Sequence, residues 1–179
     1  MKKVAQSLHK ILNMVSYLPL TAFLGTYRFT HSWPQAFVAG ACVAVVSLAV
    51  NAVMGERFER FLLAANIFLI GGGLGVAGMY FDLDGLMNLY RVGMQSTLLV
   101  SLLLVGLVTT FATRGGFLGA DKANPKKVRQ YSLYLLGATV VGTAGAIYFS
   151  LHDSGMLAGF VPFVVLKLLA KELNKKLKS

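Results

Sequence analysis

The segment GGGLGVAG at 71–78 contains the spacing Gly73-x-Gly75-x-x-Gly78, which is the fingerprint of a dinucleotide-binding loop. That chemistry needs a preceding strand, a soluble helix that begins at the glycines, and an acidic residue about 20 positions later for the ribose. Here the glycines lie inside an uncharged apolar stretch, 61–80, and leucines stand where the acidic residue is needed. The sequence therefore predicts no nicotinamide or flavin cofactor.

Other reactive side chains are scattered along the chain. DLDG at 82–85 resembles the opening of a calcium loop, but the remaining ligands are absent. His9, His31 and His152 stand in separate connections, with no cysteine or second histidine at ligand spacing. No Ser/His/Asp set, Walker loop or paired carboxylate site is present. The sequence predicts neither a metal site nor a catalytic site, and hence a protein that is not an enzyme.

The elements that carry these residues are apolar. The chain has 179 residues, of which 56% are hydrophobic and 13% charged, whereas about a quarter of a soluble domain is charged. Six apolar segments follow one another, at 13–30, 34–54, 61–80, 92–113, 131–151 and 156–170. The sequence predicts an all-α integral membrane protein, a single domain over 1–179 with about six transmembrane helices.

The positions of the basic residues predict the orientation of these segments. All 17 lysines and arginines except Arg28 and Arg91 lie in the terminal tails, at 55–60 or at 114–130, which are alternate connections between the six segments. By the positive-inside rule both termini are cytoplasmic, as in a multi-pass protein of a bacterial inner (plasma) membrane. The same distribution argues against a nucleic-acid-binding patch, despite a net charge of +10.

The cytoplasmic ends combine positive charge with amphipathic helical patterns. At the N-terminus Val4, Leu8 and Ile11 recur at helical spacing, and leucines alternate with lysines in the same way over 166–178. Both ends are expected to lie along the membrane surface. The candidate surface for anionic lipid or an acidic partner comprises Lys122, Lys126, Lys127, Arg129, Lys171 and Lys175.

Small and polar residues inside the apolar segments suggest helix packing. Gly71 with Gly75, and Gly142 with Gly145, are predicted to let helices approach closely, within the protomer or across a homo-oligomer. Glycines could instead permit a bend or break, as in transporters. The segment centres carry no ionisable residue, which argues against a proton relay. Their polar residues are expected to make interhelical hydrogen bonds, or to line a polar cavity at Asn51, Asn66 and Ser101.

YLPLTAFLGTYRF at 17–29 resembles the N-terminal span of the intracellular septation protein A family of bacterial inner-membrane proteins. The matching positions are Leu18-Pro19, Phe23, Tyr27 and Arg28, and the likeness continues loosely through ERFER at 56–60, Gly72-Gly73-Leu74 and the acidic connection before Arg91. Tyr90-Arg91 stands where the family has Trp-Lys, and the C-terminal half matches in hydropathy alone. The resemblance implies a non-enzymatic protein of septation and envelope maintenance.

Three functional hypotheses follow from these patterns. The leading hypothesis is a protein of septation or envelope maintenance that acts through helix–helix contacts and membrane-protein partners. The alternative is a small channel or transporter for an uncharged or lipidic substrate. A lipid-modifying enzyme would need reactive groups at one interface, and the outer side offers only Asp82, Asp84, Arg91, His152 and Asp153.

Overall fold

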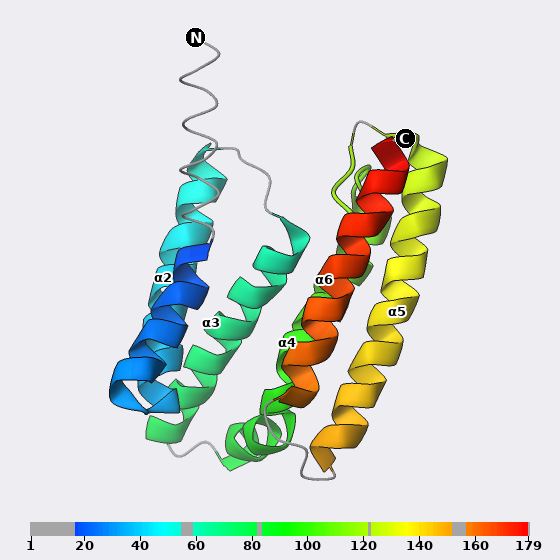
Figure 1. Ribbon diagram of the computed structural model, residues 1–179. Helices are drawn as coiled ribbons and strands as arrows, with labels where there is room; N and C mark the ends of the chain where they lie inside the picture. Colours follow the sequence, from blue (N-terminus) through cyan, green and yellow to red (C-terminus); the bar gives the residue numbers. More distant parts are fainter. Residues whose placement is uncertain (1–16, 55–58, 82–83, 122, 152–156, 179) are drawn as a thin grey trace. The chain divides into compact units, whose positions relative to one another are not determined.

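The described part of the chain is helical. A computed structural model describes residues 17–54, 59–81, 84–121, 123–151 and 157–178 (Figure 1). A first helix covers 17–30 and is followed by α2 (Trp33–Met54), α3 (Arg60–Tyr80), α4 (Asp84–Ala112), α5 (Pro125–Leu151) and α6 (Leu157–Lys178). No strand occurs among the described residues, which confirms the predicted all-α class. The amphipathic pattern expected over 1–16 lies outside them.

Three helices are long and apolar enough to cross a membrane, judged by length and composition. They are α2, α3 and the part of α5 from Pro125 to Phe149. The part of α4 whose side chains are described, Ser96–Ala112, is apolar but shorter. This agrees with a membrane protein, whereas the count of six spans and the cytoplasmic termini stay predictions.

Several helices extend beyond the apolar segments predicted for them. Helix α4 begins at Asp84 instead of 92, α5 at Pro125 instead of 131, and α6 continues to Lys178. The start of α5 shows the physical reason, because Asn124 caps it: the Asn124 Oδ1 accepts a hydrogen bond from the Lys126 N–H at 3.0 Å. Proline at the first helical position adds to this signal. Hydropathy marks the apolar stretch of a helix, whereas backbone hydrogen bonds decide its ends.

The chain divides into two compact units, and the first comprises Met1–Phe58 with Ala65–Asn88. Its described core is aromatic, with Phe37 between Phe23 and Phe68 at ring-centroid distances of 4.9 and 5.4 Å. The rings of Tyr27 and Trp33 stack at 4.0 Å across the turn that joins the first helix to α2. Two positions of the family resemblance, Phe23 and Tyr27, therefore contribute to packing in this unit.

The second unit comprises Glu59–Ala64 with Leu89–Ser179 and contains most of α4 and all of α5 and α6. Helices α5 and α6 pack side by side and run antiparallel (Figure 1). Fully buried side chains in this unit include Leu99, Leu102 and Leu135. The connection between α4 and α5 contributes Phe117, which is also fully buried.

Large apolar side chains are exposed on the candidate spans. Val53 on α2 and Val141 on α5 are 89% and 73% exposed, and Leu74 on α3 and Tyr148 on α5 are also exposed. In water such surfaces would carry a strong tendency to associate, whereas lipid tails match them. These faces therefore fit a membrane environment.

Candidate functional site

The glycines of α3 show which face of this helix packs closely in the first unit. A Cβ added at Gly72 would overlap the ring of Phe37, and one added at Gly73 would lie 2.6 Å from the Cβ of Ala41. Gly71 is exposed, and nothing lies within 4 Å of the corresponding position. Gly75 is buried. The close contact with α2 is therefore formed by Gly72 and Gly73, whereas Gly71 lies on the exposed side of the helix within the protomer. The contact of Gly71 with another copy of the chain stays a prediction, because spacing shows which residues share a face but not what covers that face.

The glycines of α5 behave differently from one another. A Cβ at Gly142 would meet Leu166 at 3.5 Å and Pro162 at 3.7 Å, both on α6. Gly142 thus lies where α5 and α6 meet, although with room for an alanine. Nothing lies within 4 Å of the corresponding point at Gly145, so this glycine makes no such contact with the described chain.

The fingerprint glycines lie in the middle of a helix. Gly73, Gly75 and Gly78 all belong to the continuous helix α3, so neither a strand nor a loop precedes them as a dinucleotide site requires. Within the described residues, no group of three His, Cys, Asp or Glu side chains is close enough to hold a metal ion. The outer candidates Asp82, His152 and Asp153 lie outside the described residues, and the side chains of Asp84 and Arg91 are not described either.

The three residues predicted for a polar cavity are all buried, but they belong to different units. Asn51 on α2 and Asn66 on α3 are in the first unit, and Ser101 on α4 is in the second. The Asn51 Nδ2 donates a hydrogen bond to the backbone oxygen of Ser47 at 2.8 Å. The Asn66 Nδ2 and the Ser47 Oγ are buried and make no hydrogen bond with the described protein.

Buried threonines in the helices satisfy their hydroxyls locally. Each donates to a backbone oxygen four residues earlier, at distances of 2.6–2.8 Å; they are Thr109 and Thr110 on α4 and Thr139 and Thr143 on α5. A hydrogen bond to the residue four positions earlier satisfies the hydroxyl in an apolar environment, so no partner on another helix is needed. Most buried polar side chains named here therefore do not need a watery lumen.

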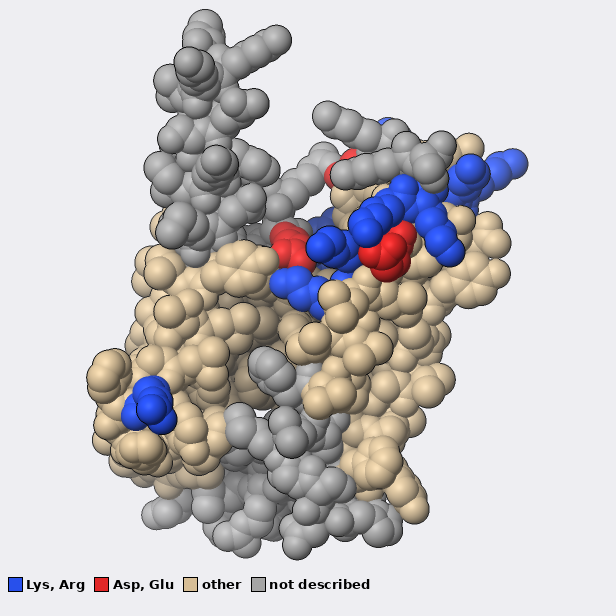
Figure 2. All heavy atoms as spheres, in the orientation of Figure 1, with Lys and Arg blue, Asp and Glu red and all other residues tan. Residues whose placement is uncertain are grey.

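A cluster of exposed cations lies where α5 begins and α6 ends. We call this surface the basic platform; it consists of Lys126, Lys127, Arg129, Lys171, Lys175 and Lys176. Figure 2 shows lysine and arginine side chains gathered at this end of α5 and α6. Lys122, also predicted for this surface, lies outside the described residues. The antiparallel packing of α5 and α6 brings together two stretches that are distant in the sequence.

The connection between α4 and α5 is folded against the second unit through Phe117. Its ring stacks on Phe61 at 5.8 Å, and it lies so close to Gly106 that a Cβ there would be 2.5 Å from the ring. The Phe117 N–H donates to the Ser132 Oγ at 3.0 Å. Gly116 has a φ of 56°, a conformation that glycine adopts without strain. These contacts pack Phe117 and its neighbours onto the second unit.

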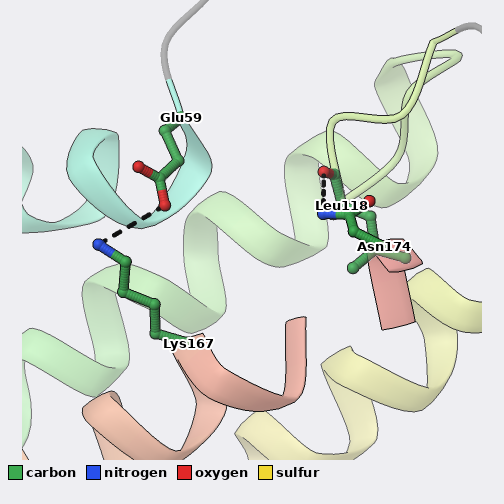
Figure 3. A network of polar contacts seen from close by, with 4 residues as sticks. All are labelled: Glu59, Leu118, Lys167 and Asn174. Atoms are coloured by element: carbon green, nitrogen blue, oxygen red, sulfur yellow. Dashed lines mark hydrogen bonds and ion pairs between the residues drawn. The ribbon is translucent and has the colours of Figure 1, made fainter. Parts of the chain in front are cut away.

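Two further polar contacts connect α6 with other segments of the second unit (Figure 3). The Asn174 Nδ2 on α6 donates to the Leu118 backbone oxygen at 3.2 Å. The Lys167 Nζ lies 3.6 Å from a carboxylate oxygen of Glu59, which immediately precedes α3. The first contact links the α4–α5 connection directly to the helix that carries half of the basic platform.

One carboxylate lies among the cations at the end of α6. The Lys175 Nζ donates to Glu172 at 2.6 Å. This hydrogen bond and the charge of Lys175 hold the pKa of the Glu172 carboxyl below its usual value. Glu172 is therefore ionised at neutral pH and offsets part of the positive charge, but the platform stays strongly cationic.

The sequence alone did not identify the residues that hold this end together. Gly106, Phe117, Ser132 and Asn174 were not among the candidates, because each has its role only through contacts with distant parts of the chain. The glycines in RGGFLG at 114–119, on both sides of a single phenylalanine, were the available signal for a tightly folded connection.

Comparison with known proteins gives no relative from which a function could be transferred. No protein-family model, no curated protein and no solved structure matches this chain. Any function must therefore be inferred from the chain's own residues and their arrangement.

Proposed function

We propose that the protein is a multi-pass protein of a bacterial inner membrane, with both termini in the cytoplasm, that is associated with septation or cell-envelope maintenance. It acts through contacts with membrane proteins and lipids instead of through catalysis. The alternation of basic connections supports the orientation. The resemblance at 17–29 supports the link to septation.

The observation that carries this proposal is the way in which buried polar groups are satisfied. Four buried threonines donate their hydroxyl hydrogen bonds to backbone oxygens of their own helices; they are Thr109, Thr110, Thr139 and Thr143. A transport pathway or a reaction centre needs such groups to face a substrate. The basic platform and the exposed apolar faces are instead surfaces that could contact partner proteins and lipid.

Deletion of the gene tests this function in the bacterium that encodes it. We expect cells with altered length or shape and increased sensitivity to detergent, because an envelope contact is lost. The measurements are cell length by microscopy and survival in bile salts. A plasmid with the wild-type gene, or with Gly71→Ala as a matched variant at an exposed position, should restore both. Normal length and normal survival in the deletion strain would contradict the proposal.

A second candidate function, transport of an uncharged solute, is favoured by one observation. The Ser47 Oγ and the Asn66 Nδ2 are buried without a hydrogen-bond partner in the described protein. Helices α2 and α3 run antiparallel, and Ala41 on α2 lies opposite Gly73 on α3. Ser47 follows Ala41 by about two helical turns, and Asn66 precedes Gly73 by about two turns, so the two residues lie at the same level of the helix pair. Two unsatisfied groups at one level could bind a neutral polar molecule.

Swelling of proteoliposomes distinguishes transport from the leading proposal. We expect liposomes with the purified protein to swell in glycerol at the rate of protein-free liposomes, because Asn51 and the buried threonines form hydrogen bonds within their own helices. Light scattering after rapid mixing gives the rate. Transport would instead give faster swelling that Asn66→Leu abolishes and Gly71→Ala leaves intact.

A further inference from the structure

We propose that the basic platform binds the phosphate headgroups of anionic phospholipids in the membrane that contains the protein. This inference rests on the membrane location proposed above. It adds a specific ligand class and a specific surface, because the positive-inside rule requires positive charge on one side of the membrane but no particular arrangement of it.

The start of α5 carries cations where they oppose folding. Lys126, Lys127 and Arg129 lie in the first turns of this helix, at the positive end of its dipole, where anions stabilise and cations destabilise. The first N–H groups of a helix have no partner within it, and Asn124 satisfies one of them. Pro125 has no N–H, and the Val128 N–H donates to the Asn124 backbone oxygen at 2.9 Å. A bound phosphate would therefore act mainly by neutralising the cations, so a ligand offsets this unfavourable placement.

The end of α6 adds its cations to the same surface. Gly142 lies opposite Pro162 and Leu166, so the antiparallel helices bring the start of α5 level with the end of α6. Asn174 is hydrogen-bonded to the connection that leads into α5, which places the last turns of α6 beside it. The cations of both helices therefore gather at one end of the second unit (Figure 2).

The surroundings of the platform favour a lipid over a soluble partner. On α5 the basic residues are followed by Tyr131 and exposed Tyr134, and then by exposed apolar residues as far as Phe149. On α6 exposed apolar residues reach Leu169, two positions before Lys171. Tyrosines between an apolar band and a row of cations are typical of the membrane–water interface, which is the depth of lipid phosphates.

Side-chain contacts tie together the backbone segments that carry the platform. Phe117 is fixed by Phe61 and by Ser132, and Asn174 ties the same connection to α6. A surface that is already ordered loses less conformational entropy when it binds a ligand. Lipid preference should therefore depend on these neutral contacts as well as on net charge.

Native mass spectrometry of the full-length protein tests the inference. The detergent-purified protein is given equal amounts of phosphatidylglycerol and phosphatidylcholine, and the ratio of the two bound lipids is measured. We expect the wild type to prefer phosphatidylglycerol and Lys127→Gln to reduce the preference about fivefold, which is the effect of one cation near an anionic surface. The matched control Arg28→Gln removes one exposed cation from the first unit and should leave the ratio unchanged.

A second pair of variants separates a built surface from net charge. Asn174→Leu keeps every charge but removes the hydrogen bond to Leu118, and it should reduce the preference at least twofold, by the entropic argument above. Asn174→Gln, which retains the donor, should recover part of it. If Asn174→Leu fails to fold, Ser132→Ala, which frees the Phe117 N–H, replaces it with the same expectation.

Three results would overturn the inference. The first is equal binding of the two lipids by the wild type, and the second is an equal loss in Lys127→Gln and Arg28→Gln. The third is displacement of phosphatidylglycerol by millimolar inorganic phosphate or by a polyglutamate peptide, which would identify a soluble anion or an acidic protein as the ligand. None of these results bears on the deletion phenotype, so failure of the lipid inference and failure of the proposed function are distinguishable.

Discussion

Replacement of Phe117 by alanine is expected to destabilise the protein by about 3–5 kcal/mol, the usual cost of emptying a buried aromatic site. Phe117 is 1% exposed and stacks on Phe61, so truncation leaves a cavity in the second unit. The connection to α5 also loses the side chain that fixes it. Thermal unfolding of the detergent-purified protein, followed by intrinsic fluorescence or circular dichroism, measures the change.

Phe111→Ala is the matched control for this variant. Phe111 lies near the end of α4, and its side chain is 62% exposed, so its loss should change the stability by less than about 0.5 kcal/mol. Equal losses in the two variants would show that Phe117 is not buried as described.

A double-mutant cycle with Gly106 tests the contact itself. Gly106→Ala places a methyl group against the Phe117 ring and should cost about 1–3 kcal/mol in the wild type. In the Phe117→Ala background the ring is absent, so the same methyl should cost little or fill part of the cavity. Additive effects would argue against a contact between these two positions.

Replacement of Gly72 by alanine is the second large effect, with an expected loss of about 2–3 kcal/mol and a fall in Tm of roughly 5–10 °C. The new methyl group would overlap the Phe37 ring. That ring cannot swing aside freely, because Phe23 and Phe68 flank it. Helices α2 and α3 must then separate or Phe37 must leave its site, and thermal unfolding of the purified protein reports either change.

The neighbouring glycine supplies the control. Gly71→Ala adds a methyl group in open space on the exposed side of the same helix, and alanine is the better helix former by up to about 1 kcal/mol. Its Tm should be unchanged or slightly higher. The double variant Phe37→Leu/Gly72→Ala should recover part of the loss, because the smaller side chain leaves room. A similar loss of stability in both alanine variants would reject the packing face assigned to Gly72.

Glycine spacing in a membrane sequence predicts packing more reliably than it predicts the packed face. At 71–75 the sequence offers four glycines in five positions, so several faces of the helix are lined with small residues. The position of Phe37 decides between them, because its ring lies over Gly72 and leaves Gly71 exposed. The residue pattern along one helix cannot predict a contact with a side chain that is more than 30 residues away in the sequence.

Charge alternation was informative for a different reason. The basic residues at 126–129 and 171–176 were predicted to share one side of the membrane, and the structure places both stretches at the same end of the second unit. Orientation depends on charges near helix ends, which are local in the sequence. The contacts that order the surface, Phe117 with Ser132 and Asn174 with Leu118, join residues 15 and 56 positions apart, so they could not be predicted.

The amino-acid sequence was enough to predict an apolar helical protein and to place its glycine fingerprint inside an apolar segment, which the described part of the chain confirms as helix α3. These properties follow from composition, periodicity and charge, all of which are read locally. Tertiary contacts were needed to show which glycines meet a neighbouring helix and that Phe117 packs the connection after α4 onto the second unit. They also show that the Asn66 Nδ2 and the Ser47 Oγ are buried and make no hydrogen bond with the described residues. Close packing and burial depend on pairs of residues that are distant in the sequence, whereas composition, periodicity and charge are properties of each segment alone.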